Sequence, residues 1–359
     1  MNTADQSSLH LLQICFLFLD ENPLAASWQD GCRDARLRIK AAELPQLFQH
    51  SRAPATLTCY GAAYTKWCRW TNKFEEVEAL PAKPLYVVLY LNDLAKTGIS
   101  FQVIVHAISA IKWAHSLSGI ESPTDAVLVK EALNSLKRKL AKKTERKEPV
   151  ASKHIQQIID NVLMTDVTDL RNSTLMVLAF FALLRSDEIR HVKKKDLSFS
   201  DTHLTLSIPR SKCDQLRYGD SVLVARLGGK HCPVALLEVY LSLLNRTGID
   251  LDGEDFIFRK VITSVNGKRF GPNNIPLTYS NFRDIVKRKL SSLGLNSMNF
   301  GTHSLRSGGA TAAANNAVSD RLLQRHGRWA GPSSACRYLA DDEENRLSVS
   351  RSIGSSLYK

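Results

Sequence analysis

The change of hydrophobic periodicity at Pro149 constrains the fold of this 359-residue chain more than any other feature of its sequence. From about Ala55 to Leu140 the apolar residues recur every three or four positions, which is typical of amphipathic helices. Beyond Pro149, the alternation over His203–Ile208 predicts a strand, and Ser221–Ala225 predicts its return partner in a hairpin. Because proline restricts the residue before it and does not fit inside a helix, Pro149 is expected to separate two domains.

The sequence therefore predicts a mainly α-helical protein with a small β-sheet. One domain would be all-α and the other mixed α/β, with a basic linker between them. In chain order the expected parts are a leader to which the sequence assigns no role (1–50), the all-α domain (51–136), the linker (137–149), the mixed domain (150–345) and a short tail (346–359).

Helix starts are indicated by proline and by residues that cap helices, such as Ser100. In the first domain, helices are expected at Ala55–Phe74, at Leu85–Lys96, after Ser100 and after Ser122. In the second domain, they are expected at Leu170–Arg190, Cys232–Leu244, Tyr279–Leu293, Ser304–Asn316 and Ser319–His326. Aromatic residues of the first helix, including Tyr64 and Trp67, are interpreted as core rather than as platforms for stacking bases.

Composition excludes several classes of protein. With 44% hydrophobic and 23% charged residues, the chain is neither disordered, collagen-like nor a coiled coil. Its best apolar run, Leu9–Leu19, has eleven residues, whereas a membrane helix needs about 20, and no basic residue precedes it as in a secretion signal. The seven cysteines form no Cys-x-x-Cys pair, which argues against a zinc ribbon and fits a reducing compartment.

The chain has a formal net charge of +13, and residues 137–148 hold seven basic and two acidic residues. Such a run between two domains suits a polyanionic partner. The alternative is a solvated helix end that continues into a linker. The basic residues are Lys137, Arg138, Lys139, Lys142, Lys143, Arg146 and Lys147.

Common enzyme motifs are missing, including His-Glu-x-x-His, Gly-x-Ser-x-Gly and the phosphate-binding lysine loop. What remains is a series of polar residues along the second domain, each of which alone would be unremarkable. Arg185 and Glu188 would lie on one helical face as an ion pair, and a lysine in a hairpin turn is usually solvated. The series comprises Arg185, Glu188, Lys212, His303, Arg306, Trp329 and Tyr338.

In this order, the residues resemble the tyrosine recombinase (phage integrase) family. The segment Ala182-Leu-Leu-Arg-Ser-Asp-Glu-Ile189 is similar to the family's first arginine box, Arg210-Ser-Lys-Cys-Asp-Gln215 to its hairpin lysine, and Thr302-His-Ser-Leu-Arg-Ser307 to its His-x-x-Arg box. Trp329 lies nine residues before Tyr338, where tryptophan can replace the family's second histidine. The resemblance covers about residues 55–345 and is closest to recombinases of eukaryotic mobile elements, the DIRS-type retrotransposons and Cryptons.

The sequence departs from the family pattern in two places. Ala182-Leu183 stands where the family often has Thr-Gly, which should affect helix packing more than chemistry. The usual Leu-Gly-His before the nucleophile is missing. The pair Gly308-Gly309, after the His-x-x-Arg box, indicates close packing of the backbone.

The resemblance implies an all-α core-binding (SAM-like) domain ahead of a catalytic domain that cuts and rejoins DNA. Tyr338 would attack the scissile phosphate, so that the 5′-hydroxyl leaves and a 3′-phosphotyrosine conserves the bond energy. No metal, ATP or other cofactor is then expected. Arg185 and Arg306 would hold the nonbridging oxygens, because a guanidinium can clasp two of them and stays charged.

The remaining residues would assist this step. Lys212 would protonate the leaving oxygen, and His303 would take a proton or hold a phosphate oxygen. Trp329 would donate a hydrogen bond to the phosphate and pack the nucleophile helix, and Glu188 would orient Arg185. Tyr218 and Tyr358 are rival nucleophiles.

The resemblance also implies partners and a location. The expected partner is double-stranded DNA, whose backbone the basic residues of the linker would contact, with a homo-tetramer in the synapse and no membrane. A nuclear location follows only from the eukaryotic resemblance. Two alternatives stay open: a DNA-binding protein descended from such an enzyme, and a type IB topoisomerase-like enzyme that relaxes DNA as a monomer.

Overall fold

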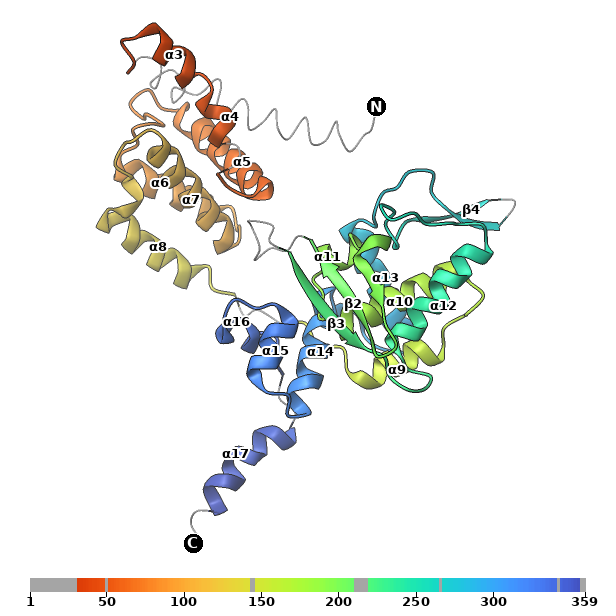
Figure 1. Cartoon of the computed structure of the whole chain (residues 1–359). Helices are drawn as coiled ribbons and strands as arrows, with labels where there is room; N and C mark the ends of the chain where they lie inside the picture. The colour runs from red at the N-terminus through yellow and green to blue at the C-terminus, as the bar shows by residue number, and fades with distance from the viewer. Residues whose placement is uncertain are drawn as a thin grey trace. The chain divides into compact units, whose positions relative to one another are not determined.

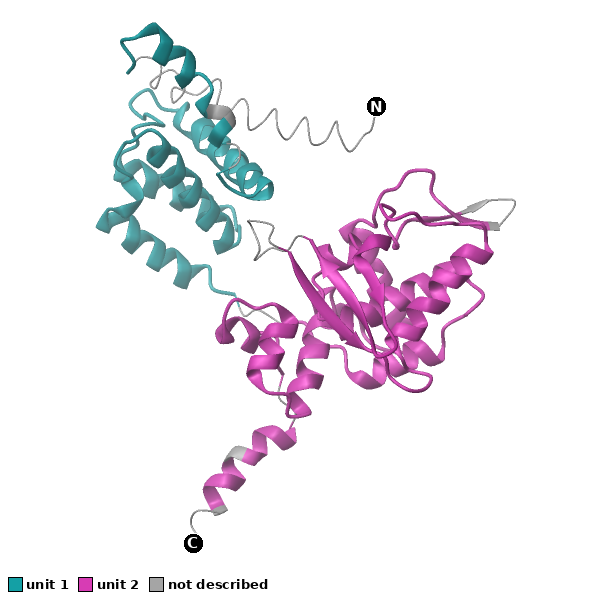
Figure 2. Ribbon diagram, in the orientation of Figure 1, with its two compact units in different colours: residues 1–144 teal, residues 145–359 magenta. Residues whose placement is uncertain are grey.

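The computed structural model describes residues 31–48, 51–142, 146–209, 219–264, 267–340 and 343–355. The chain forms two compact units, residues 1–144 and residues 145–359 (Figure 2). The described residues are mainly helical and include two small sheets, so the predicted fold class is confirmed. None of the described helices has the length and apolar character needed to cross a membrane.

The described part of the first unit contains only helices. Helix α5 packs on α7 and α6 on α8, around buried side chains that include Trp67, Leu91 and Ile104. Trp67 is fully enclosed and its Nε1 donates to the carbonyl of Ala79 at 3.0 Å, and Tyr64 is also buried, so the interpretation of both as core is confirmed. The helices are α3 (Ala35–Ala41), α4 (Leu44–Phe48), α5 (Pro54–Thr71), α6 (Pro84–Lys96), α7 (Phe101–Leu117), the 3-10 turn η1 (Pro123–Asp125) and α8 (Val127–Lys139).

The basic stretch at 137–148 begins inside a helix. Lys137, Arg138 and Lys139 form the last turn of α8, where cations are favourable because they face the negative end of the helix dipole. These three residues are exposed, as are Lys142, Arg146 and Lys147, whereas Lys143 lies outside the described residues.

The end of the stretch is fixed to the second unit. Lys147 Nζ donates to the carbonyl of Met298 at 2.5 Å, and the backbone N–H of Val150 donates to the carbonyl of Ser304 at 2.9 Å. Residues 147–150 are therefore held against the 3-10 turn η3 (Ser297–Asn299) and the start of helix α14 (His303–Asn315).

The other elements of the second unit pack around one long apolar helix, α10 (Val167–Phe181). Figure 1 shows α10 beside α12 and α14, and all three contribute to a single large core with the antiparallel sheet β1-β2-β3. In the predicted hairpin, β2 pairs with β3 and the register ends at Ile208 opposite Asp220. The elements are α9 (Ser152–Asp160), α10 (Val167–Phe181), α11 (Ser186–Arg190), the 3-10 turn η2 (Lys194–Asp196), β1 (Leu197–Phe199), β2 (His203–Ile208), β3 (Asp220–Ala225), α12 (Pro233–Arg246), β4 (Val261–Ser264), β5 (Gly267–Phe270), α13 (Tyr279–Ser292), the 3-10 turn η3 (Ser297–Asn299), α14, α15 (Asp320–Gly327), α16 (Pro332–Cys336) and α17 (Glu343–Ser355).

Two glycines let α14 approach the centre of this unit. A Cβ on Gly308 would lie 2.0 Å from the carbonyl oxygen of Val150, and one on Gly309 would lie 2.2 Å from that of Phe180. No side chain fits at such distances. The close packing predicted from Gly308-Gly309 is therefore confirmed.

One predicted helix is wrong in its extent. The sequence predicts a single helix over Leu170–Arg190, but the structure has two, α10 and α11, with a bend between them. Leu183 lies in the bend with φ 47°, a left-handed conformation that stops a helix and that favours glycine. Arg185 and Glu188 consequently do not share one helical face.

Candidate active site

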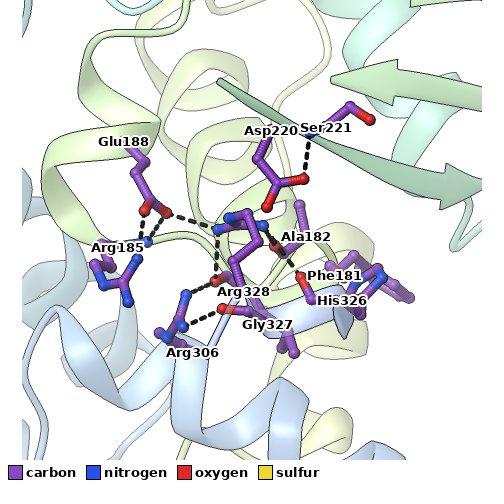
Figure 3. A network of polar contacts seen from close by, with 11 residues as sticks. Phe181, Ala182, Arg185, Glu188, Asp220, Ser221, Arg306, His326, Gly327 and Arg328 are labelled. Carbon is purple, nitrogen blue, oxygen red and sulfur yellow. Dashed lines mark hydrogen bonds and ion pairs between the residues drawn. The ribbon is translucent and has the colours of Figure 1, made fainter. Parts of the chain in front are cut away.

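The bend between α10 and α11 is held by side chains from distant parts of the chain. Arg306 and Arg328 donate to the carbonyl of Leu183, and His326 Nε2 lies 2.8 Å from that of Phe181 (Figure 3). These donors satisfy carbonyls that a continuous helix would pair internally. The bend therefore depends on α14, on the last turn of α15 and on Arg328, which follows that helix.

Arg185 caps α11 and forms an ion pair with Glu188. Its backbone N–H donates to Glu188 Oε2 at 2.8 Å, and its Nη1 donates to Oε1 at 2.7 Å. The pair is enclosed, because the Arg185 side chain is 13% exposed and that of Glu188 only 3%. It differs in this from the exposed helical pair that the spacing alone predicts.

Glu188 is ionised despite its burial. Burial alone would raise the pKa of its carboxyl, but the charge of Arg328 and the hydrogen bonds from Arg185 outweigh that effect and hold the pKa below its ordinary value. One buried carboxylate thus serves two guanidiniums.

Arg306 is fully buried on the first turns of α14. Its Nη2 donates to the carbonyl of Gly327 at 2.5 Å, and its Cζ lies 4.6 Å from the ring centre of Trp329 and 5.1 Å from that of Tyr338. Burial and the charge of Arg185 lower the pKa of Arg306 to about 10, so the guanidinium still carries its charge at neutral pH.

Tyr338 follows the short helix α16 and packs into the same cluster. Its ring centre lies 5.3 Å from that of Trp329 and 6.4 Å from that of His303, which is exposed at the start of α14. Thr311 fixes the backbone there, since its hydroxyl donates to the carbonyl of Tyr338 at 3.4 Å and accepts from the N–H of Ala340 at 3.1 Å.

The indole of Trp329 packs against both Arg306 and Tyr338. Its side chain is buried, and Gly327 packs so closely on the indole that a Cβ there would lie 2.0 Å from a ring atom. The buried donors Thr302 Oγ1, Arg306 Nε, Arg328 Nε and Trp329 Nε1 have no partner among the described residues.

The structure brings together most of the residues that the sequence singles out: Arg185, Glu188, His303, Arg306, Trp329 and Tyr338. Lys212 and the rivals Tyr218 and Tyr358 lie outside the described residues. Among the described residues, no group of His, Cys, Asp and Glu side chains could hold a metal ion.

The sequence singles out the segment His326-Gly327-Arg328-Trp329 but gives a role only to Trp329, so it assigns none to His326 and Arg328, and it does not indicate Thr311. Arg328 contacts Glu188, which is 140 positions away, so no local spacing indicates the pair. The only sequence sign is a basic residue between Gly327 and Trp329, and that pattern is common at surfaces.

The arrangement is suited to an anion. Two guanidiniums and an exposed imidazole lie around a partly buried phenol, and the local carboxylate is already engaged by arginines. A phosphodiester entering this site would meet fixed positive charge, and the adjacent phenol is a nucleophile once its proton is removed.

Known proteins have sequences similar to this chain. The chain is 28% identical over 309 residues to an integrase/recombinase XerD homolog of Selenomonas ruminantium, covering 85% of this chain and 86% of the relative. It is 21% identical over 292 residues to the recombinase Cre of Escherichia phage P1, covering 77% of this chain and 80% of the relative.

Solved structures agree with these relatives. The XerH site-specific recombinase, in a post-cleavage complex with its palindromic difH substrate, matches with a TM-score of 0.57 and 16% identity over 91% of this chain and 86% of that protein. A lambda integrase dimer bound to a COC′ core site matches with a TM-score of 0.52 and 15% identity over 82% of this chain and 74% of that protein. The phage integrase family model matches residues 148–345, which is more than half of the sequence and includes every residue of the candidate site, and the chain therefore belongs to the phage integrase (tyrosine recombinase) family.

Proposed function

We propose that this protein is a site-specific DNA recombinase that cuts and rejoins DNA strands with Tyr338 as nucleophile, and that it serves the integration of a mobile element. One observation carries the assignment of the nucleophile. The guanidinium of Arg306 lies against both Trp329 and Tyr338, at 4.6 Å and 5.1 Å from their ring centres, next to the Arg185–Glu188 pair. A phosphate held by the two arginines would therefore be beside the phenol.

In the proposed step, the Tyr338 oxygen forms a bond to phosphorus while the bond from phosphorus to the 5′-oxygen breaks. The phenol loses its proton, for which His303 is the candidate acceptor, and the leaving oxygen gains one, for which Lys212 is the candidate donor. Arg185 and Arg306 stabilise the charge that develops on the nonbridging oxygens. Rejoining is the reverse step, with a 5′-hydroxyl as nucleophile, so the two phosphodiesters exchange without ATP.

Trp329 has two roles in this proposal. Its ring packs against Tyr338 and Arg306, and its Nε1, which none of the described residues satisfies, is a donor for a phosphate oxygen. A buried donor without a partner is unfavourable, so a phosphate contact would remove that penalty.

The decisive experiment is a covalent trap. Purified protein is incubated with nicked DNA from the flanks of its own element and run on a denaturing gel. We expect a DNA-dependent slow band that is lost in Tyr338→Phe and kept in Tyr218→Phe and Tyr358→Phe. A band that survives in Tyr338→Phe would refute the assignment of the nucleophile.

The same experiment distinguishes an active recombinase from the alternative, a DNA-binding protein that has lost its catalytic activity. That alternative predicts no band on any flanking DNA, together with salt-sensitive binding to the same DNA. What favours activity is that the described site still holds its tyrosine, both arginines and its histidine together.

A homo-tetramer on two duplexes is part of the proposal and distinguishes it from a type IB topoisomerase-like enzyme. We expect sedimentation with two-site DNA to give a tetramer. Plasmid relaxation that persists at concentrations where the protein is monomeric would favour the topoisomerase instead.

We also propose a eukaryotic mobile element as the source and the nucleus as the location. These two proposals are supported by the residues found in the recombinase motifs and by the exposed basic residues that begin at Lys137. A fluorescent fusion in a eukaryotic cell should accumulate in the nucleus, and replacing the basic residues of 137–147 by glutamine should abolish the accumulation.

A further inference from the structure

Position 328 is an unusual one for a long charged side chain such as that of Arg328. It follows α15 with φ 53°, a left-handed backbone that disfavours residues other than glycine, and its side chain is only 3% exposed. Neither the backbone conformation nor contact with water accounts for an arginine here.

The guanidinium of Arg328 connects three segments of the site (Figure 3). Its Nη2 donates to Glu188 Oε2 at 2.7 Å and lies 3.4 Å from the carbonyl oxygen of Leu183. Its Nη1 donates to the carbonyl of His326 at 3.1 Å and lies 3.5 Å from that of Ala182. Arg328 therefore joins α11, the bend before it and the end of α15.

These contacts determine how Glu188 meets Arg185. Arg328 and the backbone N–H of Arg185 occupy Oε2, so Oε1 alone faces the Arg185 guanidinium, at 2.7 Å from Nη1. A carboxylate free at both oxygens tends to bind arginine through two parallel hydrogen bonds. Without Arg328, Oε2 would keep only the backbone N–H of Arg185, and its second lone pair would attract the guanidinium of Arg185 and turn it from its present direction.

Arg328 is not placed to bind the phosphate itself. Its side chain is enclosed, and both terminal nitrogens already contact protein oxygens. The other charged or titratable groups of the network are Arg185, Arg306, His326 and Asp220 (Figure 3). Among the described residues, the carboxylate that Arg328 engages is that of Glu188.

We propose that Arg328 is a positioning residue for DNA cleavage, which acts through Glu188 to aim the guanidinium of Arg185 at the scissile phosphate. The inference rests on the proposed function and adds to it a residue that touches neither the phosphate nor the nucleophile.

The test compares four variants and one control variant with the wild type in single-turnover formation of the covalent complex. Arg328→Gly removes the guanidinium at a position whose backbone suits glycine, which limits unfolding. Arg328→Lys keeps the positive charge but loses the pair of terminal guanidinium nitrogens, here called the fork. Glu188→Gln removes the partner, alone and combined with Arg328→Gly. Arg325→Lys, an exposed arginine on α15, is the matched control.

We expect Arg328→Gly to slow cleavage by about 10²-fold, as for a misplaced catalytic group, with unchanged DNA affinity. Loss of the arginine also raises the pKa of the buried Glu188, so the acid limb of the pH–rate profile should move to higher pH in Arg328→Gly. Arg328→Lys should be slower than the wild type by about 10-fold while its acid limb stays in place, because a lysine keeps the charge but not the two-nitrogen fork.

The double variant decides whether Arg328 acts through Glu188. If it does, adding Arg328→Gly to Glu188→Gln should cause no further loss of rate, because the partner is already gone. Losses that multiply, or an Arg328→Gly protein that cleaves within threefold of the wild type with the same acid limb, would overturn the inference. A wild type that forms no covalent complex would instead count against the proposed function.

Circular dichroism and urea unfolding show whether Arg328→Gly is folded. If it is not, Arg328→Lys carries the test, and a wild-type rate for that variant would reject the role of the fork.

Discussion

Arg306 has three properties that a lysine at this position would not have together: two hydrogen bonds from one side chain, a flat face against aromatic rings, and a retained charge. Its fork donates to the carbonyls of Leu183 and Gly327, and its plane lies against two aromatic rings. Burial and the charge of Arg185 also lower its pKa to about 10, which an arginine tolerates at neutral pH. A lysine starts from an ordinary pKa of about 10.4, so the same surroundings would bring it much nearer to neutrality.

Arg306→Lys should therefore slow cleavage by about 10²–10³-fold, the usual cost of one donor to a developing oxyanion. DNA affinity should stay close to that of the wild type, because most of the binding charge is elsewhere. The measurement is the single-turnover rate of covalent complex formation, with the exposed Arg283→Lys as control. A rate within a few-fold of the wild type would mean that the phosphate is held without Arg306.

His326 makes the bend before Arg185 sensitive to acid. Burial lowers the pKa of its imidazole below the ordinary value, although the contact of Nε2 with the Phe181 carbonyl works in the opposite direction. The unfolded chain thus binds a proton at a higher pH than the folded protein. The stability linked to His326 is present above about pH 6.5, the ordinary value, and is lost as the pH falls below it.

His326→Gln, whose amide can still donate to Phe181, should reduce this loss. We expect the free energy of unfolding to fall less in the variant than in the wild type between pH 7.5 and 5.5, by less than the limit of about 1.4 kcal/mol per pH unit for one proton. Urea titrations at both pH values measure the difference. Parallel losses in the two proteins would show that His326 is not a source of the acid sensitivity.

The elements of this protein differ in how far the sequence predicts them. The alternation over His203–Ile208 is local, so the hairpin strands β2 and β3 are predicted to within a residue. The bend at Leu183 depends on Arg306, Arg328 and Gly309, which are more than a hundred positions away, and the local pattern alone favours an unbroken helix. Strands of three or four residues, such as β1 and β4, are too short for alternation to show.

The contact of α14 with the segment after the linker gives a stability prediction. Gly308→Ala would place a Cβ 2.0 Å from the Val150 carbonyl, so the backbone must move apart. We expect a loss of about 1–3 kcal/mol, the usual cost of overpacking, seen as a lower urea midpoint with unchanged slope. In Gly228→Ala the new Cβ meets no atom within 4 Å, so this control should stay within about 0.5 kcal/mol. Equal effects in both variants would contradict the packing argument.

Over the whole molecule, the sequence predicts the family because the proposed catalytic residues occur in a fixed order along the chain. The residues that hold these side chains in place could not be predicted in the same way. The order Arg, Lys, His-x-x-Arg, Trp, Tyr needs no knowledge of contacts. By contrast, Arg328 reaches Glu188 across 140 positions, and Thr311 reaches the backbone at Tyr338 across 27. Such pairs follow from the fold and become visible only with it.

Binding to DNA is the property that depends on the charge of the entire chain. The net charge is +13, and the last turn of α8 exposes Lys137, Arg138 and Lys139 together. Each phosphate that a cation neutralises releases counterions, so the logarithm of affinity falls by about 0.9 per contact for each tenfold rise in salt. We expect a steep salt dependence for the wild type. The triple variant Lys137→Gln, Arg138→Gln, Lys139→Gln should have a slope that is smaller by up to about 3.

A matched triple variant shows whether the position of the charge matters. Lys96, Lys112 and Lys195 are also exposed, but each forms an ion pair with a carboxylate, so their replacement by glutamine should change the slope much less. Fluorescence anisotropy with one duplex, at several salt concentrations, measures both slopes. If the two triple variants lose the same slope, the end of α8 contributes only to the general charge of the protein, and the basic residues of 137–147 are a solvated helix end rather than a DNA contact.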